Sequence, residues 1–190
     1  IRYRPNPSYL AAASIIRKSV DRLSSPIASL VNGLINGETH IVERSSIGAQ
    51  EDQEGTDQQN QSGVDVWTIV YELSRVAPDI ITTVLGNVSS CLSSPHLSRR
   101  QQVVKLLGKL FYARGSKLAK KFSPCYRQWL SRSNDSEWKI RLDMVHCLVS
   151  ILKANPHPEP VEEALNTLTR IIQYDPKLDV RLAALHDVCD

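Results

Sequence analysis

Hydrophobic residues recur at intervals of three and four positions along most of the chain, and strict alternation of apolar and polar residues is absent. This spacing places apolar side chains on one face of an α-helix, whereas a half-buried strand needs a period of two. The first half is therefore predicted to hold helices over residues 9–23, 27–34, 66–76 and 81–92. Because the same spacing continues beyond residue 92, the whole fold is expected to be all-α.

The second half is predicted to hold helices over residues 103–110, 126–130, 137–153 and 161–172, with a last helix from about residue 180. The helix over 137–153 is apolar nearly all round, so it is expected to be covered on more than one side. An outer helix of a simple bundle would not need such cover.

An internal repeat links two of these predicted helices. Asp135–Leu142 and Asp175–Leu182 share the pattern D-x-x-x-x-[IV]-R-L with an offset of 40 residues, and Arg100–Val104 resembles Arg141–Val145 at an offset of 41. A period of this length with two helices in each unit is typical of a HEAT array. The predicted fold is therefore a right-handed α-α superhelix, a HEAT-repeat solenoid.

A segment of different composition interrupts this pattern. Residues 44–63 contain five Gln, three Gly and four acidic residues, with only two aliphatic side chains. So little apolar surface cannot offset the entropy of ordering the segment. We predict an N-terminal helical hairpin of the solenoid at 1–43, a disordered low-complexity insertion at 44–63, and HEAT-type repeats at 64–190; an ordered surface loop is the alternative for 44–63.

The repeated Asp and Arg residues are interpreted as structural. An Asp near the start of a helix favours the positive end of the helix dipole, and an inward Arg can pair with an Asp of its own or the neighbouring unit. Repeats reuse structural rather than catalytic residues. We therefore predict a structural ladder that sets the register between units, formed by Asp135, Arg141, Asp175 and Arg181.

The formal net charge of +3 conceals a strongly basic block. Residues 93–141 carry 12 basic and two acidic side chains, whereas the segments on either side carry a net −3 and −4. Clustered cations on a solenoid could bind an acidic or phosphorylated protein segment, an inositol polyphosphate or a nucleic-acid backbone. The candidate anion- or partner-binding residues are Arg99, Lys105, Lys109, Arg114, Lys117, Lys120, Lys121 and Arg127.

Two considerations limit this hypothesis. The same cations could form a solvated helix face, with Arg100 and Arg141 engaged in the ladder. DNA is the weaker partner hypothesis, because most aromatic residues near the cations fall on apolar stripes where a core role is the better interpretation.

The sequence lacks the common motifs of catalysis and metal binding. No phosphate-binding loop, dinucleotide fingerprint, nucleophile elbow or H-E-x-x-H occurs, although a triad assembled from distant positions would leave no such motif. The four Cys lie 34, 22 and 42 residues apart, which suits neither a zinc site nor a tight disulfide framework. We expect a non-enzymatic protein without a metal, a membrane span or a resident cofactor.

Several short runs resemble, in order and spacing, the precocious-dissociation-of-sisters family of cohesin-associated HEAT proteins. These runs are VYELSRVAP (70–78), VKLLGKLF (104–111), WLSR (129–132) followed by Asp135, Ile140-Arg141 and VCD (188–190). Asn6-Pro7 and the first predicted helices resemble the segment that precedes the family's repeats. The insertion before Tyr71-Glu72-Leu73 makes plant-type members the most similar.

The resemblance implies a non-enzymatic, nuclear regulator of sister chromatid cohesion, drawn from the early-middle part of a longer solenoid. It also implies binding to the kleisin subunit of cohesin and to the wings-apart-like release factor, but no contact residues can be carried over. A HEAT adaptor of another class, such as a condensin-like or nuclear-transport scaffold, remains the alternative. In a cell-cycle protein Ser25-Pro26, Ser94-Pro95 and Ser123-Pro124 could be proline-directed phosphorylation sites, although each also stands where a helix is predicted to begin.

Overall fold

The computed structural model describes residues 6–37, 65–113, 117–154 and 158–189, and this part of the chain contains helices and connections but no strand. The α-helices are α1 (Pro7–Asn36), α2 (Val66–Val76), α3 (Pro78–Ser90), α4 (Leu97–Tyr112), α5 (Leu118–Lys121), α6 (Ser123–Leu130), α7 (Trp138–Ala154), α8 (Pro158–Tyr174) and α9 (Leu178–Cys189). Two short 3₁₀ helices, η1 (Cys91–Ser93) and η2 (Ser131–Asn134), precede the connections into α4 and α7. The all-α prediction is confirmed.

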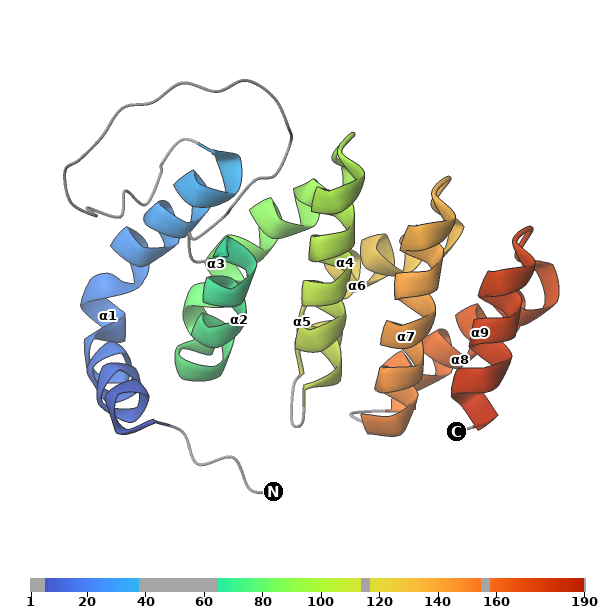
Figure 1. Cartoon of the computed structure of the whole chain (residues 1–190). Helices are drawn as coiled ribbons and strands as arrows, with labels where there is room; N and C mark the ends of the chain where they lie inside the picture. Colours follow the sequence, from blue (N-terminus) through green and yellow to red (C-terminus); the bar gives the residue numbers. More distant parts are fainter. Residues whose placement is uncertain (1–5, 38–64, 114–116, 155–157, 190) are drawn as a thin grey trace, which may run out of the picture.

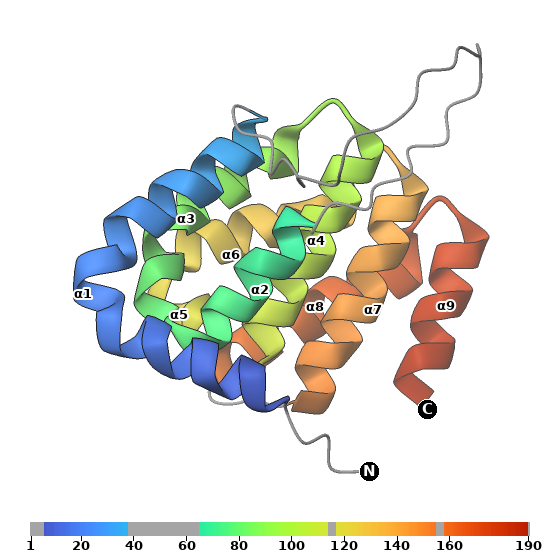
Figure 2. The same cartoon turned by 60° about the vertical axis from the view of Figure 1, so that its left-hand side comes forward.

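The helices form two layers. Figures 1 and 2 show α2, α4, α7 and α9 side by side in one layer, with α3, α6 and α8 behind them. Each unit thus contributes one helix to each layer, as in a helical-repeat solenoid. Figure 1 also shows the connections that enter α4, α7 and α9 along one edge of the array, which we call the entry edge.

Helix α7 lies at the centre of the second half. It contacts α4, α8 and α9, and Ile140, Met144, Val145 and Leu148 are fully buried. The prediction that this helix is covered on more than one side is therefore confirmed.

An aromatic cluster joins α4 to α6. The ring of Phe111 meets the rings of Tyr126 and Trp129 edge-on, at centroid distances of 5.1 and 5.4 Å. Trp129 Nε1 donates to the carbonyl of Val104 at 3.0 Å, so the buried indole is satisfied. Gly108, also on α4, allows the close approach of α7, because a Cβ at that position would lie 2.5 Å from the Sγ of Cys147.

The N-terminal segment differs from the prediction. Residues 9–23 and 27–34 belong to one helix, α1, with Pro26 inside it, so the two-helix hairpin expected at 1–43 is wrong. Pro26 removes one backbone hydrogen bond and its ring crowds the preceding turn, which bends a helix without necessarily ending it; α1 bends along its length in Figure 1.

Contacts on both sides of the proline keep α1 helical. Ala13 is buried before it, and Ala28, Val31 and Ile35 are buried after it, where α1 packs against α2 and α3. The predicted insertion at 44–63 lies outside the described residues.

Candidate functional site

One turn recurs three times along the entry edge. In each copy an Arg on the first turns of a helix donates from Nη1 to the backbone carbonyl six residues earlier. The three pairs are Arg100 with Ser94 (2.7 Å), Arg141 with Asp135 (2.8 Å), and Arg181 with Asp175. In each copy the side chain of that earlier residue also accepts from the backbone N–H two positions on, at 3.3, 3.0 and 2.8 Å respectively.

Arg100 and Arg141 also reach into the following unit. Arg141 Nε and Nη2 donate to the carboxylate of Asp175 at 2.7 and 3.0 Å. The two side chains are only 8% and 2% exposed. A two-bond ion pair of this kind fixes both distance and orientation, and so links the turn before α7 to the turn before α9.

The ion pair between Arg141 and Asp175 shifts the pKa of both groups. Burial raises the pKa of the Asp175 carboxyl, but hydrogen bonds from Arg141 and from the N–H of Lys177, with the charges of Arg141 and Arg181, outweigh it, so the net pKa lies below its ordinary value. The hydrogen bond to Asp175 raises the pKa of Arg141. Both groups are therefore charged at neutral pH.

The junction between the turn before α4 and the turn before α7 is held by longer contacts. Arg100 Nη2 approaches the carboxylate of Asp135 at 3.3 Å, and Arg132 Nη1 approaches its other oxygen at 3.5 Å. Two guanidinium groups therefore share one carboxylate. Within the part of the chain that the structure describes, the buried Nε atoms of Arg100 and Arg132 have no hydrogen-bond partner.

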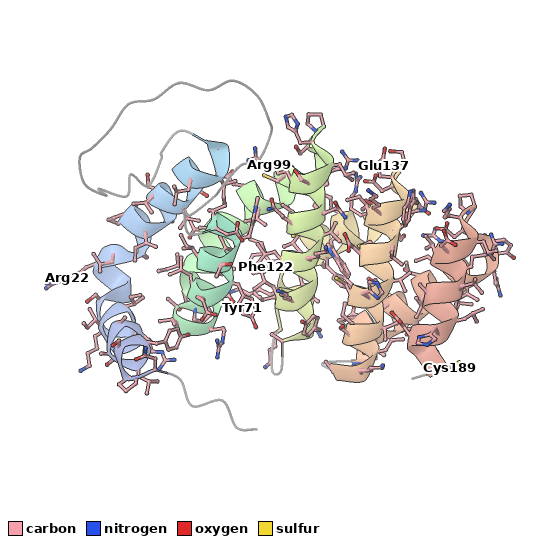
Figure 3. The ribbon with its side chains drawn as sticks, viewed as in Figure 1. Arg22, Tyr71, Arg99, Phe122, Glu137 and Cys189 are labelled. Atoms are coloured by element: carbon pink, nitrogen blue, oxygen red, sulfur yellow. The ribbon has the colours of Figure 1, made fainter. Side chains whose placement is uncertain are left out.

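The predicted basic set is divided among several surfaces instead of forming one face. Arg99, at the start of α4 (Figure 3), donates to the carbonyl of Ile35 at the end of α1. Lys105 pairs with Asp143 at 3.1 Å, and Lys109 lies over the ring of Tyr71 at 5.8 Å. Arg114 lies outside the described residues.

The cations at the C-terminal end of the basic block also lie on two different surfaces. Lys120 and Arg127 line a small cavity of about 210 Å³ together with Glu159 and Glu163, and Arg127 Nε lies 4.0 Å from Glu163. Carboxylates from α8 therefore offset the charge of these two cations. Of the predicted set, Lys117 and Lys121 face a larger opening.

This opening, which we call the basic groove, has a volume of about 980 Å³ and lies at the edge opposite to the entry edge. It is formed by the ends of α2, α4 and α7, the start of α3 and the segment around α5. Among the described residues, its charged lining consists of Arg75, Lys117, Lys121, Lys153 and one acid, Asp79. Its apolar lining includes Tyr71 (Figure 3), Leu110, Tyr112 and Leu118.

Two groove cations, Arg75 and Lys153, were not among the predicted site residues. Arg75 belongs to the acidic first half of the chain, and Lys153 lies 32 residues beyond Lys121. Neither has a cationic neighbour in sequence that would mark it. Only the packing of the ends of α2 and α7 beside α5 brings them to Lys117 and Lys121.

Two other kinds of site are absent from the part of the chain that the structure describes. It contains no group of three His, Cys, Asp or Glu residues that could hold a metal ion. None of its helices has the length and apolar character needed to cross a membrane.

Comparison with known proteins identifies the family. The model of the sister chromatid cohesion protein PDS5 family matches residues 2–190. The zebrafish sister chromatid cohesion protein PDS5 homolog A is 26% identical over 185 residues, which is 95% of this chain and 12% of the relative. The human and chicken PDS5 homolog B proteins are each 32% identical over 127 residues, which is 65% of this chain and 8% of each relative. The chain therefore spans about a tenth of the length of these relatives, and it belongs to the PDS5 family of sister chromatid cohesion proteins.

Proposed function

We propose that the chain is part of a non-enzymatic nuclear scaffold that regulates sister chromatid cohesion by binding the kleisin subunit of cohesin and the wings-apart-like release factor. The observation that carries this proposal is the family match over residues 2–190. The architecture supports it, because stacked helix pairs present extended surfaces suited to binding other proteins. The same match ranks a condensin-like or nuclear-transport adaptor behind a cohesin regulator.

The basic groove is the surface that we assign to partner binding. Of the residues that the structure describes, Lys117, Lys121 and Lys153 line it together with Arg75, which also pairs with Glu72 at 3.2 Å, and Asp79 is its one lining carboxylate, so its field favours an anionic segment. Tyr71, Leu110 and Tyr112 give it an apolar lining on which a side chain of that segment could pack. An acidic or phosphorylated peptide with an apolar anchor fits both features.

The division of the basic set argues against a nucleic-acid partner for the whole block. Lys105 is paired with Asp143, and Arg127 lies beside Glu163. A nucleic-acid backbone needs a continuous basic track, whereas these cations alternate with carboxylates on different surfaces.

Fluorescence anisotropy with a labelled acidic kleisin segment tests the proposal. Replacing Lys117 and Lys121 together by Glu is expected to weaken binding about tenfold or more, because both charges are reversed beside the bound anion. Lys120→Glu is the matched control, since Lys120 belongs to the same short helix but faces the other cavity. Its expected effect is about twofold at most, as for a charge outside the contact.

The outcomes separate the two parts of the proposal. Absence of binding to any kleisin segment rejects the partner. Binding that Lys120→Glu weakens as much as the groove variant rejects the groove. Binding of a DNA duplex with equal affinity and equal salt dependence replaces the protein partner by a general polyanion.

A further inference from the structure

Ser94 occupies a position in its unit that corresponds to the ladder aspartates in the next two. It precedes Arg100 by six residues, as Asp135 precedes Arg141 and Asp175 precedes Arg181. Its carbonyl and its side-chain oxygen make the same two hydrogen bonds as theirs. Ser94 therefore occupies a position at which the next two units carry an anionic side chain, but Ser94 itself is neutral.

Among the residues that the structure describes, the surroundings of Ser94 contain more positive than negative charge. A cavity of about 370 Å³ at the entry edge is lined by Ser94, Arg100, Arg132 and Asp135. Arg132 Nη1 makes two long hydrogen bonds to described residues, to the carbonyl of Leu92 at 3.3 Å and to Asp135 at 3.5 Å. Within the described part of the chain, its Nη2 donates no hydrogen bond, so this group can donate to further anionic oxygens, whereas its unpaired Nε is buried.

Among the described residues, the start of α4 also lacks a compensating negative group in its cap and first turn. His96, the residue that precedes the helix, makes no side-chain capping bond, and the first turn contains no acid. A negative group near this end would be stabilised by the helix dipole. Arg99, labelled in Figure 3, and Arg100 add positive charge to the same turn.

The backbone singles out Ser94 among the three Ser-Pro dipeptides in the sequence. Ser25 lies inside α1, and Ser123 is the first residue of α6. Ser94 instead lies between η1 and α4 with an extended backbone, φ −58° and ψ 139°, and its neighbours Ser93 and Pro95 are exposed. A protein kinase binds its substrate as an extended segment, so the helical sites would first have to unfold.

We propose that Ser94 is a phosphorylation site for a proline-directed protein kinase, and that Arg132, with Arg100, receives the phosphate. In the reaction the Ser94 Oγ attacks the γ-phosphorus of ATP and the bond from that phosphorus to the bridging oxygen breaks. ADP leaves with the electron pair, and the hydroxyl proton passes to the base of the kinase. The product carries a charge between −1.5 and −2 at the register where the next units carry Asp.

The phosphate strengthens the looser of the two junctions. Its oxygens accept hydrogen bonds from the Nη2 group of Arg132 in η2, which also pairs with Asp135, and thereby connect the entry to α4 with the entry to α7. Asp135 opposes the added charge, but its carboxylate is already shared by two guanidinium groups. This inference is independent of which partner the basic groove takes.

The first measurement is site selection. The 190-residue chain is incubated with ATP and a cyclin-dependent kinase, and phosphopeptides are quantified by mass spectrometry. Ser94 is expected to be modified at least tenfold faster than Ser25 and Ser123, and Ser94→Ala is expected to lose the main product. Failure to modify Ser94, or equal rates at Ser123, overturns the proposal.

The second measurement locates the phosphate. Phosphorylation is expected to raise the melting temperature by about 2–4 °C, which is the shift that one new charge-assisted contact produces in a chain of this size. Arg132→Gln is expected to remove at least half of that shift, and Arg132→Lys to restore part of it, since lysine keeps the charge but not the planar fork. Each variant is compared with its own unphosphorylated form, and an equal shift in Arg132→Gln overturns the assignment of the receiving residue.

Discussion

Arg141 on α7 and Asp175 before α9 are joined by two hydrogen bonds, of 2.7 and 3.0 Å, in a nearly solvent-free junction between repeats. The same guanidinium donates to the carbonyl of Asp135 at 2.8 Å. One side chain therefore closes the turn of its own unit and clamps the turn of the next. A slip of either helix by one residue would break both connections, so we propose that the pair specifies the register of the stack.

Removing the anion of this pair is expected to destabilise the fold strongly. Asp175→Asn keeps the shape of the side chain but leaves Arg141 charged and buried without its counter-ion. The expected loss is about 3 kcal/mol of unfolding free energy, as for other buried pairs that lose one partner. Urea denaturation monitored by circular dichroism measures it.

An exposed ion pair at the start of α9 is the control. Lys177 and Asp179 lie 3.3 Å apart, with 47% and 64% of their side chains exposed. Asp179→Asn is expected to cost about 0.5 kcal/mol or less, because solvent screens an exposed pair. Equal losses in the two variants would show that the buried pair does not specify the register.

The lowered pKa of Asp175 predicts a pH dependence of stability. Because the folded pKa lies below the unfolded one, the ionised carboxylate stabilises the fold fully above the unfolded pKa of about 4. That contribution is lost as the pH falls through the folded value. The difference in unfolding free energy between the wild type and Asp175→Asn should therefore shrink below about pH 4, and a constant difference from pH 6 to pH 3 would contradict the prediction.

The sequence points to the proposed ladder residues because they recur at a fixed interval. Asp135, Arg141, Asp175 and Arg181 stand at a fixed offset, and that offset reflects a turn that the structure repeats. The correspondence of Ser94 is less visible, because only the hydrogen bonds of its turn show that it shares the register.

The basic groove and α1 show what local patterns miss. Arg75 and Lys153 reach the groove only through the packing of helices distant in sequence. Pro26 indicates a helix start by local rules, yet burial of Ala28 and Val31 against neighbouring helices holds α1 together through it. In both cases tertiary contacts determine the structure, and a sequence period or a motif does not contain those contacts.

Thiol reactivity is expected to follow burial. Burial raises the pKa of Cys147 to about 12, and burial also raises the pKa of Cys125 to about 11 despite an opposing hydrogen bond from Ser89. Cys189, at the end of α9, is exposed. Since the thiolate is the reactive form, iodoacetamide at neutral pH should label Cys189 first and leave Cys147 unmodified in the folded chain. Peptide mass spectrometry follows the labelling, and equally fast reaction at Cys147 would contradict its burial.

The close approach of α4 and α7 at Gly108 gives a prediction in which two opposing effects compete. Alanine improves helix propensity by about 1 kcal/mol, but the new Cβ would lie 2.5 Å from the Sγ and 2.9 Å from the Cβ of Cys147. Overpacking of this kind costs about 1–3 kcal/mol and the backbones must separate, so Gly108→Ala is expected to destabilise the fold on balance.

Gly86 in α3 is the matched control, because a Cβ there would meet no described atom within 4 Å. Gly86→Ala is expected to stabilise by about 0.5–1 kcal/mol. Urea denaturation of both variants distinguishes the effects, and stabilisation by Gly108→Ala would mean that the two helices do not pack this closely.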